Sequence, residues 1–258
     1  MSIFLWQGVA PDTELCGDQA QPSLEPFPVE GSRGAMNVCP GGGYVGKAAH
    51  EGAPIAQMIN QAGVSAFVLD YRVKPFRIET ALGDALRAIR VVRSMGYEQV
   101  AIMGFSAGGH LAASAATLWD AGDPASDDPI ERLSSRPDAF ASCYGATSFR
   151  LFEKTWAREV LGEERGRDNA SIVRYTAELN VRPDTPPAFI WHTADDETVP
   201  VECALRLMGA LSAKGVNYEA HIYPHGRHGL GLATDDPAVG QWGRHMSRWL
   251  IDRGFGAK

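Results

Sequence analysis

The sequence predicts an α/β protein built on one doubly wound, mostly parallel sheet, and three observations lead to this prediction. Strand-like and helix-like runs alternate along most of the chain. The central strand candidates are almost continuously apolar, which is typical of parallel strands covered by helices on both faces. The chain has 258 residues, 45% of them hydrophobic and 21% charged, so one large domain with a substantial core is expected.

Six short runs are the strand candidates, and amphipathic runs lie between them. The strands are expected at 36–39, 65–70, 99–103, 139–144, 188–193 and 217–223. Helices are expected at about 48–62, 78–95 and 201–213, directly after residue 106, and close to the C-terminus. Gly96 and Gly215 mark two helix ends. Ligands of such a sheet bind at the carboxyl ends of its strands.

Residues 1–258 are therefore expected to form a single domain with two less regular segments. Residues 1–34 read as a loop-rich N-terminal segment that contains several prolines. Residues 146–186 read as a lid-like insertion, and its aromatic side chains include Phe152 and Trp156.

The composition argues against several classes of function. A formal net charge of −7 disfavours nucleic-acid and anionic-membrane partners. The first residues lack the basic region of a signal peptide, and no run reaches the ~18 apolar residues of a membrane span. The four scattered cysteines contain no C-x-x-C pair, and the histidines form no cluster in the sequence. We therefore expect a cytoplasmic protein without metal or cofactor, and homo-oligomerisation is left open.

The stretch GFSAG at 104–108 fits the pattern G-x-S-x-G and indicates nucleophilic catalysis. It lies directly between an apolar strand and a helix, where a nucleophilic serine needs a sharp turn and small neighbours. Ser106 is therefore the candidate nucleophile. The backbone N–H of Ala107 follows it at a helix N-terminus, where negative charge is favoured, and is a candidate oxyanion donor.

A serine nucleophile needs a histidine base and an acid that orients the base, and both follow in the expected order. The acid is expected in ADDETVP, residues 194–200, which offers Asp195 and Asp196. Asp196 is preferred because it opens D-x-x-V-P before the next helix. The base is expected in YPHGRHGLGLA, residues 223–233, and His228 is preferred to His225 because glycines flank it.

The stretch PGGGYVG at 40–46 also satisfies G-x-G-x-x-G, the pattern of dinucleotide-binding loops. Such a loop has an acidic residue about 20 positions further on, whereas Asp70 follows Gly41 by 29 positions. The dinucleotide interpretation also gives Ser106 no role. We therefore expect the backbone amides of residues 40–46 to take part in the reaction of the serine.

Several segments together resemble the bacterial α/β-hydrolase esterases, in particular acetyl esterases and acetyl-xylan esterases. They are PGGGY (40–44), LDYR (69–72), GFSAGGHLA (104–112), SRPD (135–138), DTPPAFIWHTADDETVP (184–200) and GRHGLGLA (226–233). The resemblance extends from about residue 35 to 235. It implies an α/β-hydrolase fold and hydrolysis of short acyl esters, often acetyl groups on xylose-containing saccharides.

Carried over residue by residue, the resemblance makes Ser106 the nucleophile, Asp196 the acid and His228 the base. The glycines at 41–43 resemble the oxyanion loop of the family. For the proposed reaction we expect the amides of Gly42, Gly43 and Ala107 to form the oxyanion hole, and Tyr44 and Trp156 to line the substrate pocket. An amide-cleaving serine hydrolase of the peptidase or formamidase type would use the same residues and stays as the alternative. The chain departs from the family pattern at Gly145 and Ala146, where proline and valine are usual, and this leaves the substrate open.

Overall fold

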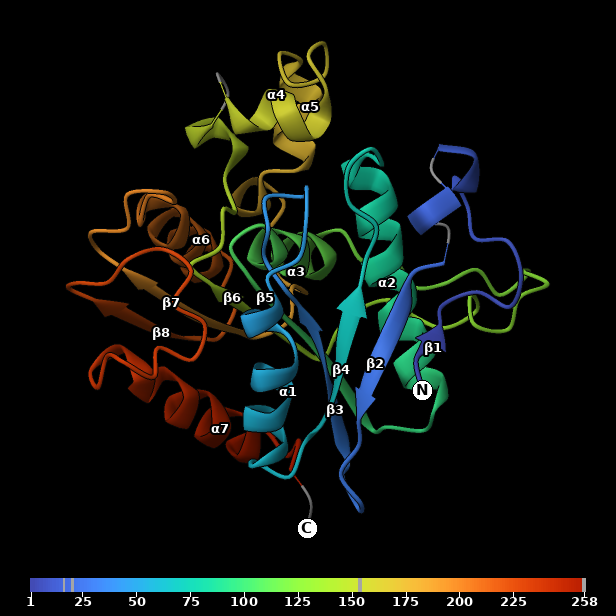
Figure 1. Ribbon diagram of the computed structural model, residues 1–258, viewed down its shortest axis with the longest axis horizontal. Coiled ribbons are helices and arrows are strands. Elements are labelled where there is room, and N and C mark those ends of the chain that lie inside the picture. Colours follow the sequence, from blue (N-terminus) through green and yellow to red (C-terminus); the bar gives the residue numbers. More distant parts are fainter. Residues whose placement is uncertain (16, 20, 153–154, 257–258) are drawn as a thin grey trace.

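An eight-stranded sheet forms the centre of the computed structural model, which describes residues 1–15, 17–19, 21–152 and 155–256 (Figure 1). The strands follow the order β1-β2-β4-β3-β5-β6-β7-β8. From β4 to β8 all neighbouring strands are parallel, whereas β1 and β2 are antiparallel additions beside β4. The strands span Ile3–Phe4, Ser23–Phe27, Gly34–Cys39, Ser65–Asp70, Gln99–Phe105, Ala139–Cys143, Ala188–Thr193 and Tyr218–Tyr223.

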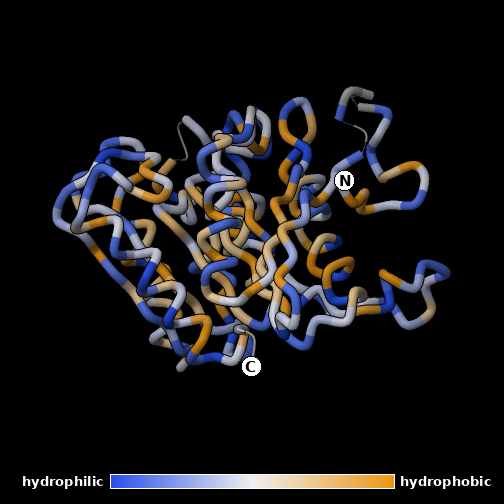
Figure 2. Tube along the Cα trace, turned by 60° about the horizontal axis from the view of Figure 1, so that its bottom comes forward, coloured by the Kyte–Doolittle hydropathy of each residue, from blue (hydrophilic) through white to orange (hydrophobic). Residues whose placement is uncertain are grey.

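Helices cover both faces of this sheet and enclose two separate apolar cores. The helices are α1 (Ala53–Asn60), α2 (Ile78–Ser94), α3 (Ala107–Thr117), α4 (Trp156–Leu161), α5 (Asn169–Arg174), α6 (Glu202–Ala213) and α7 (Trp242–Asp252). Side chains of α2, α3 and α6 pack in one core, and those of α1 and α7 pack in the other. Figure 2 shows the hydrophobic segments concentrated in the central strands and the hydrophilic ones toward the rim. The predicted doubly wound α/β architecture is confirmed.

The predicted strands all form, while the N-terminal segment holds structure that the sequence did not indicate. Strands β4 and β7 have the predicted bounds, and the other predicted strands differ by one or two residues at an end. Strand β2 lies within the segment expected to be loop-rich and pairs with β4 over Ser23–Phe27. Pro26 in β2 breaks the usual strand pattern, but β1 pairs only with Ser23 and Leu24, so β2 has a single neighbouring strand at Pro26, where a residue without an N–H is tolerated.

The segment 146–186 carries the two short helices α4 and α5 and lies beyond the carboxyl ends of the strands (Figure 1). Residues 153–154, within the predicted lid-like insertion, lie outside the described residues. So does Cys16, whereas Cys39, Cys143 and Cys203 are buried free thiols. Among the described residues, no helix is long and apolar enough to cross a membrane.

Candidate active site

Ser106 lies in a strained turn between β5 and α3. Its φ of 52° and ψ of −118° are unfavourable for a residue with a side chain, and such a conformation costs about 1–3 kcal/mol. The backbone holds it there: the Ser106 N–H donates to the Cys143 carbonyl (3.0 Å), and the Ser106 carbonyl accepts from the His110 and Ala146 N–H groups. The turn raises the hydroxyl at the carboxyl edge of the sheet.

The two glycines of GFSAG are required by close backbone contacts. A Cβ on Gly104 would lie 2.0 Å from the Gly108 carbonyl oxygen. A Cβ on Gly108 would lie 2.1 Å from the Cys39 carbonyl oxygen, at the end of β3. Because β3 and β5 are neighbours, the motif brings the nucleophile next to the loop that follows β3.

A chain of two hydrogen bonds joins Ser106, His228 and Asp196. The Ser106 hydroxyl donates to Nε2 of His228 (2.8 Å), and Nδ1 of His228 donates to Oδ2 of Asp196 (2.7 Å). These residues come from the ends of β5, β7 and β8, so the sheet assembles them. The hydrogen bond to Asp196 selects the imidazole tautomer that leaves Nε2 free to accept a proton.

The two aspartates of the sequence ADDETVP have different environments. Asp196 is buried, and its Oδ1 accepts the N–H groups of Thr198 and Val199, both at 2.9 Å. Burial alone would raise its pKa, but hydrogen bonds from His192, His228 and the Val199 N–H hold the pKa well below its ordinary value. Asp196 is therefore ionised at neutral pH.

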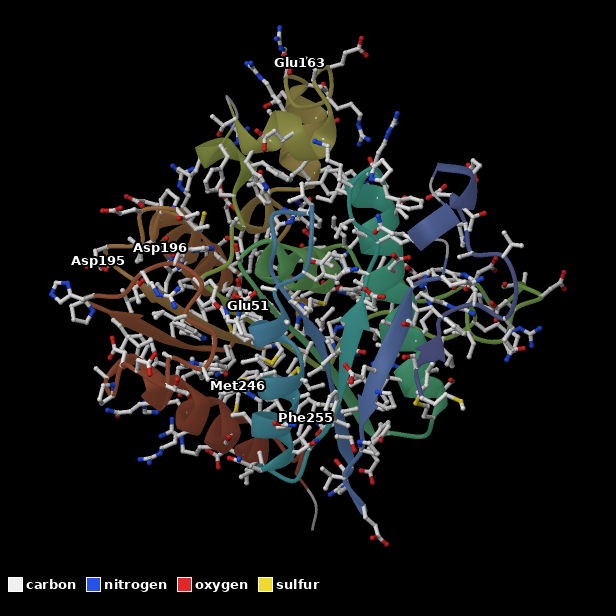
Figure 3. All side chains as sticks on the ribbon, in the orientation of Figure 1. Glu51, Glu163, Asp195, Asp196, Met246 and Phe255 are labelled. Carbon is white, nitrogen blue, oxygen red and sulfur yellow. The ribbon has the colours of Figure 1, made fainter. Side chains whose placement is uncertain are left out.

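Asp195 points the other way, toward solvent. It accepts from Nδ1 of His225 (2.9 Å) and from the Gly226 N–H (2.7 Å), and both side chains of this pair are largely exposed. Figure 3 shows Asp195 at the periphery and Asp196 further inward. The structure thus brings Asp196 and His228 to Ser106, and it leaves the alternatives Asp195 and His225 outside the site.

The loop at residues 40–46, which we call the oxyanion loop, lies beside Ser106. Gly42 and Gly43 have φ of 134° and 65°, values that favour glycine. Among the described residues, neither of their N–H groups donates a hydrogen bond. The Ala107 N–H is the first of α3 and has no acceptor within its helix. These amides are available to an anion that forms next to the serine.

A cavity of about 500 Å³ opens over these groups. Gly42, Gly43 and Ala107 line it together with Ser106 and His228. Its apolar wall consists of Ala146, Phe152, Trp156 and Val199, and its polar wall includes His50, Glu51, Glu159 and Thr198. Trp156, a predicted substrate contact, thus belongs to the wall of this cavity.

Tyr44, the other predicted substrate contact, is not among the described residues that line the cavity. Its side chain is only 5% exposed, and its hydroxyl donates to Nδ1 of His110 (2.8 Å), whose Nε2 in turn donates to the Tyr175 carbonyl. Its ring stacks on Trp156, at a centroid distance of 5.9 Å. Burial lowers the pKa of His110 to about 4, so the ring is neutral. Tyr44 therefore packs against Trp156 and is not itself part of the cavity wall.

Two residues of the site had no role in the sequence analysis. Glu51 is 2% exposed and accepts from the Gly41 N–H (2.7 Å) and from the Tyr144 hydroxyl (2.6 Å). Glu51 belongs to no motif, so no sequence signal marks it. Tyr144 could have been singled out because it directly follows a strand next to that of the nucleophile.

One cluster outside the site resembles a metal-binding group. Glu219, His221 and His245 present ligand atoms that all lie within 4.8 Å of one another, at strand β8 and helix α7. The two imidazoles stack at 4.3 Å and 16°, so their in-plane lone pairs run side by side instead of converging on one ion. Arg248 moreover forms an ion pair with Glu219 (2.8 Å). We assign no metal to this cluster.

The parallel sheet, the serine on its strained turn and the acid and histidine at later strand ends together define an α/β hydrolase. Residues 33–211, more than half of the chain, match the BD-FAE family. The chain belongs to this family.

Its relatives are carboxylic ester hydrolases and xylan-degrading enzymes. The chain is 31% identical over 226 residues to an acetylxylan esterase of Xylanibacter ruminicola. This alignment covers 83% of this chain and 43% of that protein. It is 33% identical over 217 residues to endo-1,4-β-xylanase B of Butyrivibrio fibrisolvens, with 79% of this chain and 33% of that protein aligned. The chain therefore spans only about a third to two fifths of the length of these two relatives.

Two solved structures are similar along almost their whole length. The acetyl ester-xyloside bifunctional hydrolase of Caldicellulosiruptor lactoaceticus has a TM-score of 0.92 and 40% identity, with 99% of this chain and 97% of that chain covered. A carboxylesterase of Lactobacillus plantarum has a TM-score of 0.78 at 22% identity, with 100% of this chain and 98% of that chain covered, and shows the shared fold. These likenesses agree with the α/β-hydrolase fold of the chain.

Proposed function

We propose that this protein is a serine carboxylesterase that removes short acyl groups, above all acetyl, from xylose-containing saccharides. The observation that carries the proposal is the hydrogen-bonded chain from Ser106 through His228 to the buried Asp196, at the mouth of a cavity lined by free amides. An unpaired serine or an exposed acid would not support it.

The reaction proceeds in two steps through an acyl-enzyme. Nε2 of His228 takes the proton of Ser106 while the hydroxyl oxygen attacks the ester carbonyl. The amides of Gly42, Gly43 and Ala107 donate to the oxyanion, and loss of one such donor typically costs about 3–4 kcal/mol. Asp196 stabilises the imidazolium. His228 then gives the proton to the departing alcohol, and a water molecule, activated in the same way, hydrolyses the acyl-enzyme.

The lining of the site supports an acyl group and a hydroxyl-rich alcohol. The apolar wall of the cavity suits the acyl chain. A second hollow of about 470 Å³ shares Thr198 and His228 with the cavity, and Asp195, Glu197 and Arg227 also line it. These polar side chains suit the hydroxyl groups of a saccharide. The similarity to an acetylxylan esterase and to an acetyl ester-xyloside hydrolase supports the same substrate class.

The test is acetate release from acetylated xylo-oligosaccharides, compared with 4-nitrophenyl esters of increasing acyl length. We expect acetate release, a fall in kcat/KM as the acyl chain lengthens, and no turnover by Ser106→Ala. A phosphonate probe should label Ser106 alone. Activity that survives in Ser106→Ala would exclude the mechanism, and faster cleavage of 4-nitroacetanilide than of 4-nitrophenyl acetate would favour the amidase alternative.

A further inference from the structure

Glu51 is a buried carboxylate beside the cavity, and the reaction just described gives it no role. It ends a 3-10 turn, η3 (Ala49–Glu51), that leads into α1, near the centre of the molecule in Figure 3. Burying a carboxylate is unfavourable unless its oxygens accept hydrogen bonds. Each oxygen of Glu51 has one strong donor: Gly41 for Oε2 and Tyr144 for Oε1.

The first hydrogen bond holds the oxyanion loop. The Gly41 N–H donates to Oε2 at 2.7 Å, directly before the two glycines that line the cavity together with Ser106. A Cβ on Gly41 would lie 2.7 Å from Oε2 of Glu51 and 3.0 Å from Cβ of Ser106. Gly41 is therefore wedged between the carboxylate and the nucleophile, so a shift of Glu51 would shift the loop.

The second hydrogen bond reaches the loop that carries the base, residues 224–233, which we call the His228 loop. The Tyr144 hydroxyl donates to Oε1 of Glu51 and accepts from the Gly231 N–H (2.9 Å). The Tyr144 ring meets the His228 ring edge-on, at a centroid distance of 5.2 Å. Tyr144 thus contacts the base with its ring and the loop of the base with its hydroxyl.

We propose that Glu51 is a positioning residue that ties the oxyanion loop to the His228 loop. The transition state needs the oxyanion donors and the imidazole in place at the same time, and a misplacement of about 1 Å can cost a hundredfold in rate. One carboxylate is bonded to the oxyanion loop directly and to the His228 loop through Tyr144. It therefore holds the distance between the oxyanion donors and the imidazole constant. Each of its oxygens accepts a hydrogen bond from one of these partners, so Glu51 is assigned a positioning role that it exerts through the two loops. The proposal rests on the esterase mechanism above.

The variants Glu51→Gln and Tyr144→Phe break this link at different points. In Glu51→Gln the amide oxygen can still accept from Gly41, but its NH2 group faces Tyr144, whose hydroxyl loses its acceptor. In Tyr144→Phe the link to Gly231 is lost as well. We expect each to lower kcat on 4-nitrophenyl acetate, and the rate at which a phosphonate labels Ser106, on the order of tenfold to a hundredfold, with KM nearly unchanged.

The double variant tests whether the two residues act as one unit. We expect the kcat of Glu51→Gln/Tyr144→Phe to be no lower than that of the less active single variant, because both changes break the same link. Glu178→Gln is the matched control: Glu178 also accepts a short hydrogen bond, from the Ser148 hydroxyl (2.6 Å), but does not line the cavity. It should change Tm without changing kcat.

The proposal is overturned if Glu51→Gln behaves like Glu178→Gln, with kcat within threefold of the wild type, or if the losses of the two single variants multiply in the double variant. If Glu51→Gln does not fold, Tyr144→Phe alone decides, by the same limit on kcat. The rate at which the phosphonate labels Ser106 can be measured without the natural substrate. A failure of the saccharide assignment therefore leaves this test intact, whereas a wild-type enzyme that is not labelled at Ser106 contradicts the proposed function itself.

Discussion

Replacing Asp196 by asparagine tests the site most directly, because the structure determines how the new amide must lie. Oδ1 of Asp196 accepts two backbone N–H groups, from Thr198 and Val199. The amide oxygen must keep this position, because an NH2 group there would face two donors. The NH2 group then faces Nδ1 of His228, where the carboxylate had accepted a proton.

His228 can meet this NH2 group only with an unprotonated Nδ1, so its proton moves to Nε2. Nε2 then faces Ser106 with a proton and cannot accept another one. The same change in a serine protease lowers kcat about 10⁴-fold. We expect a loss on the order of 10⁴ in kcat here, or roughly 5 kcal/mol of transition-state stabilisation. Nitrogen NMR of His228 should show the exchanged tautomer directly.

Asp195→Asn is the control because it changes the neighbouring carboxylate in the same loop. Asp195 bonds only His225 and the Gly226 N–H, both at the surface. We expect kcat on 4-nitrophenyl acetate to stay within about threefold of the wild type, as for most surface changes. If Asp195→Asn lost more activity than Asp196→Asn, or if Asp196→Asn stayed within tenfold, the assignment of the acid and the tautomer argument would both be refuted.

Two further predictions concern His110, which is buried behind the cavity, and Trp156 in its wall. His110 has a pKa of about 4 in the folded protein, against about 6.5 in an unfolded chain. Its neutral ring therefore contributes stability that is complete above about pH 6.5 and is lost as the pH falls toward 4. This group alone should remove about 2 kcal/mol from the free energy of unfolding between pH 7 and pH 5. An NMR titration checks it, and a His110 ring that titrates near 6.5 would disprove it. Trp156→Phe keeps the aromatic wall but removes the indole N–H that donates to the Gly43 carbonyl (3.3 Å). A hydrogen bond contributes about 1 kcal/mol net, so we expect its loss to lower kcat/KM roughly fivefold. An unchanged kcat/KM at equal Tm would show that this bond does not support the oxyanion loop.

The residues of the candidate site could largely be predicted from the sequence, because the prediction depends on local patterns. A serine between glycines, after an apolar run and before a helix, has one favoured local geometry. The order of strands and helices placed the acid and the histidine after later strands, and parallel strands end on the same edge. The preference for Asp196 and His228 over their neighbours also came from local context, namely the segment before a helix and the flanking glycines.

Other features depend on contacts between distant parts of the chain. The hydroxyl of Ser106 meets His228 across 122 positions, and Tyr144 meets Glu51 across 93. The first pair forms because the strands from β5 to β8 end on one edge of the sheet, and the second because β3, β5 and β6 are neighbours. Strand order is not written in any single segment. The pairing of β2 with β4 was missed for the same reason, since a short strand with a proline gains its stability from its neighbour.

Side-chain orientation is the second property that local pattern does not specify. Tyr44 follows the glycines of the oxyanion loop, which suggested a substrate contact, but a φ of 62° turns its side chain inward to His110. Glu51 looks like an ordinary acidic residue at the start of a helix, and only the packing of three loops around it makes it a buried acceptor. Residue order was enough to predict the candidate reacting groups, because such groups need characteristic neighbours. The groups that hold them in place need only a partner in space, and folding alone supplies it.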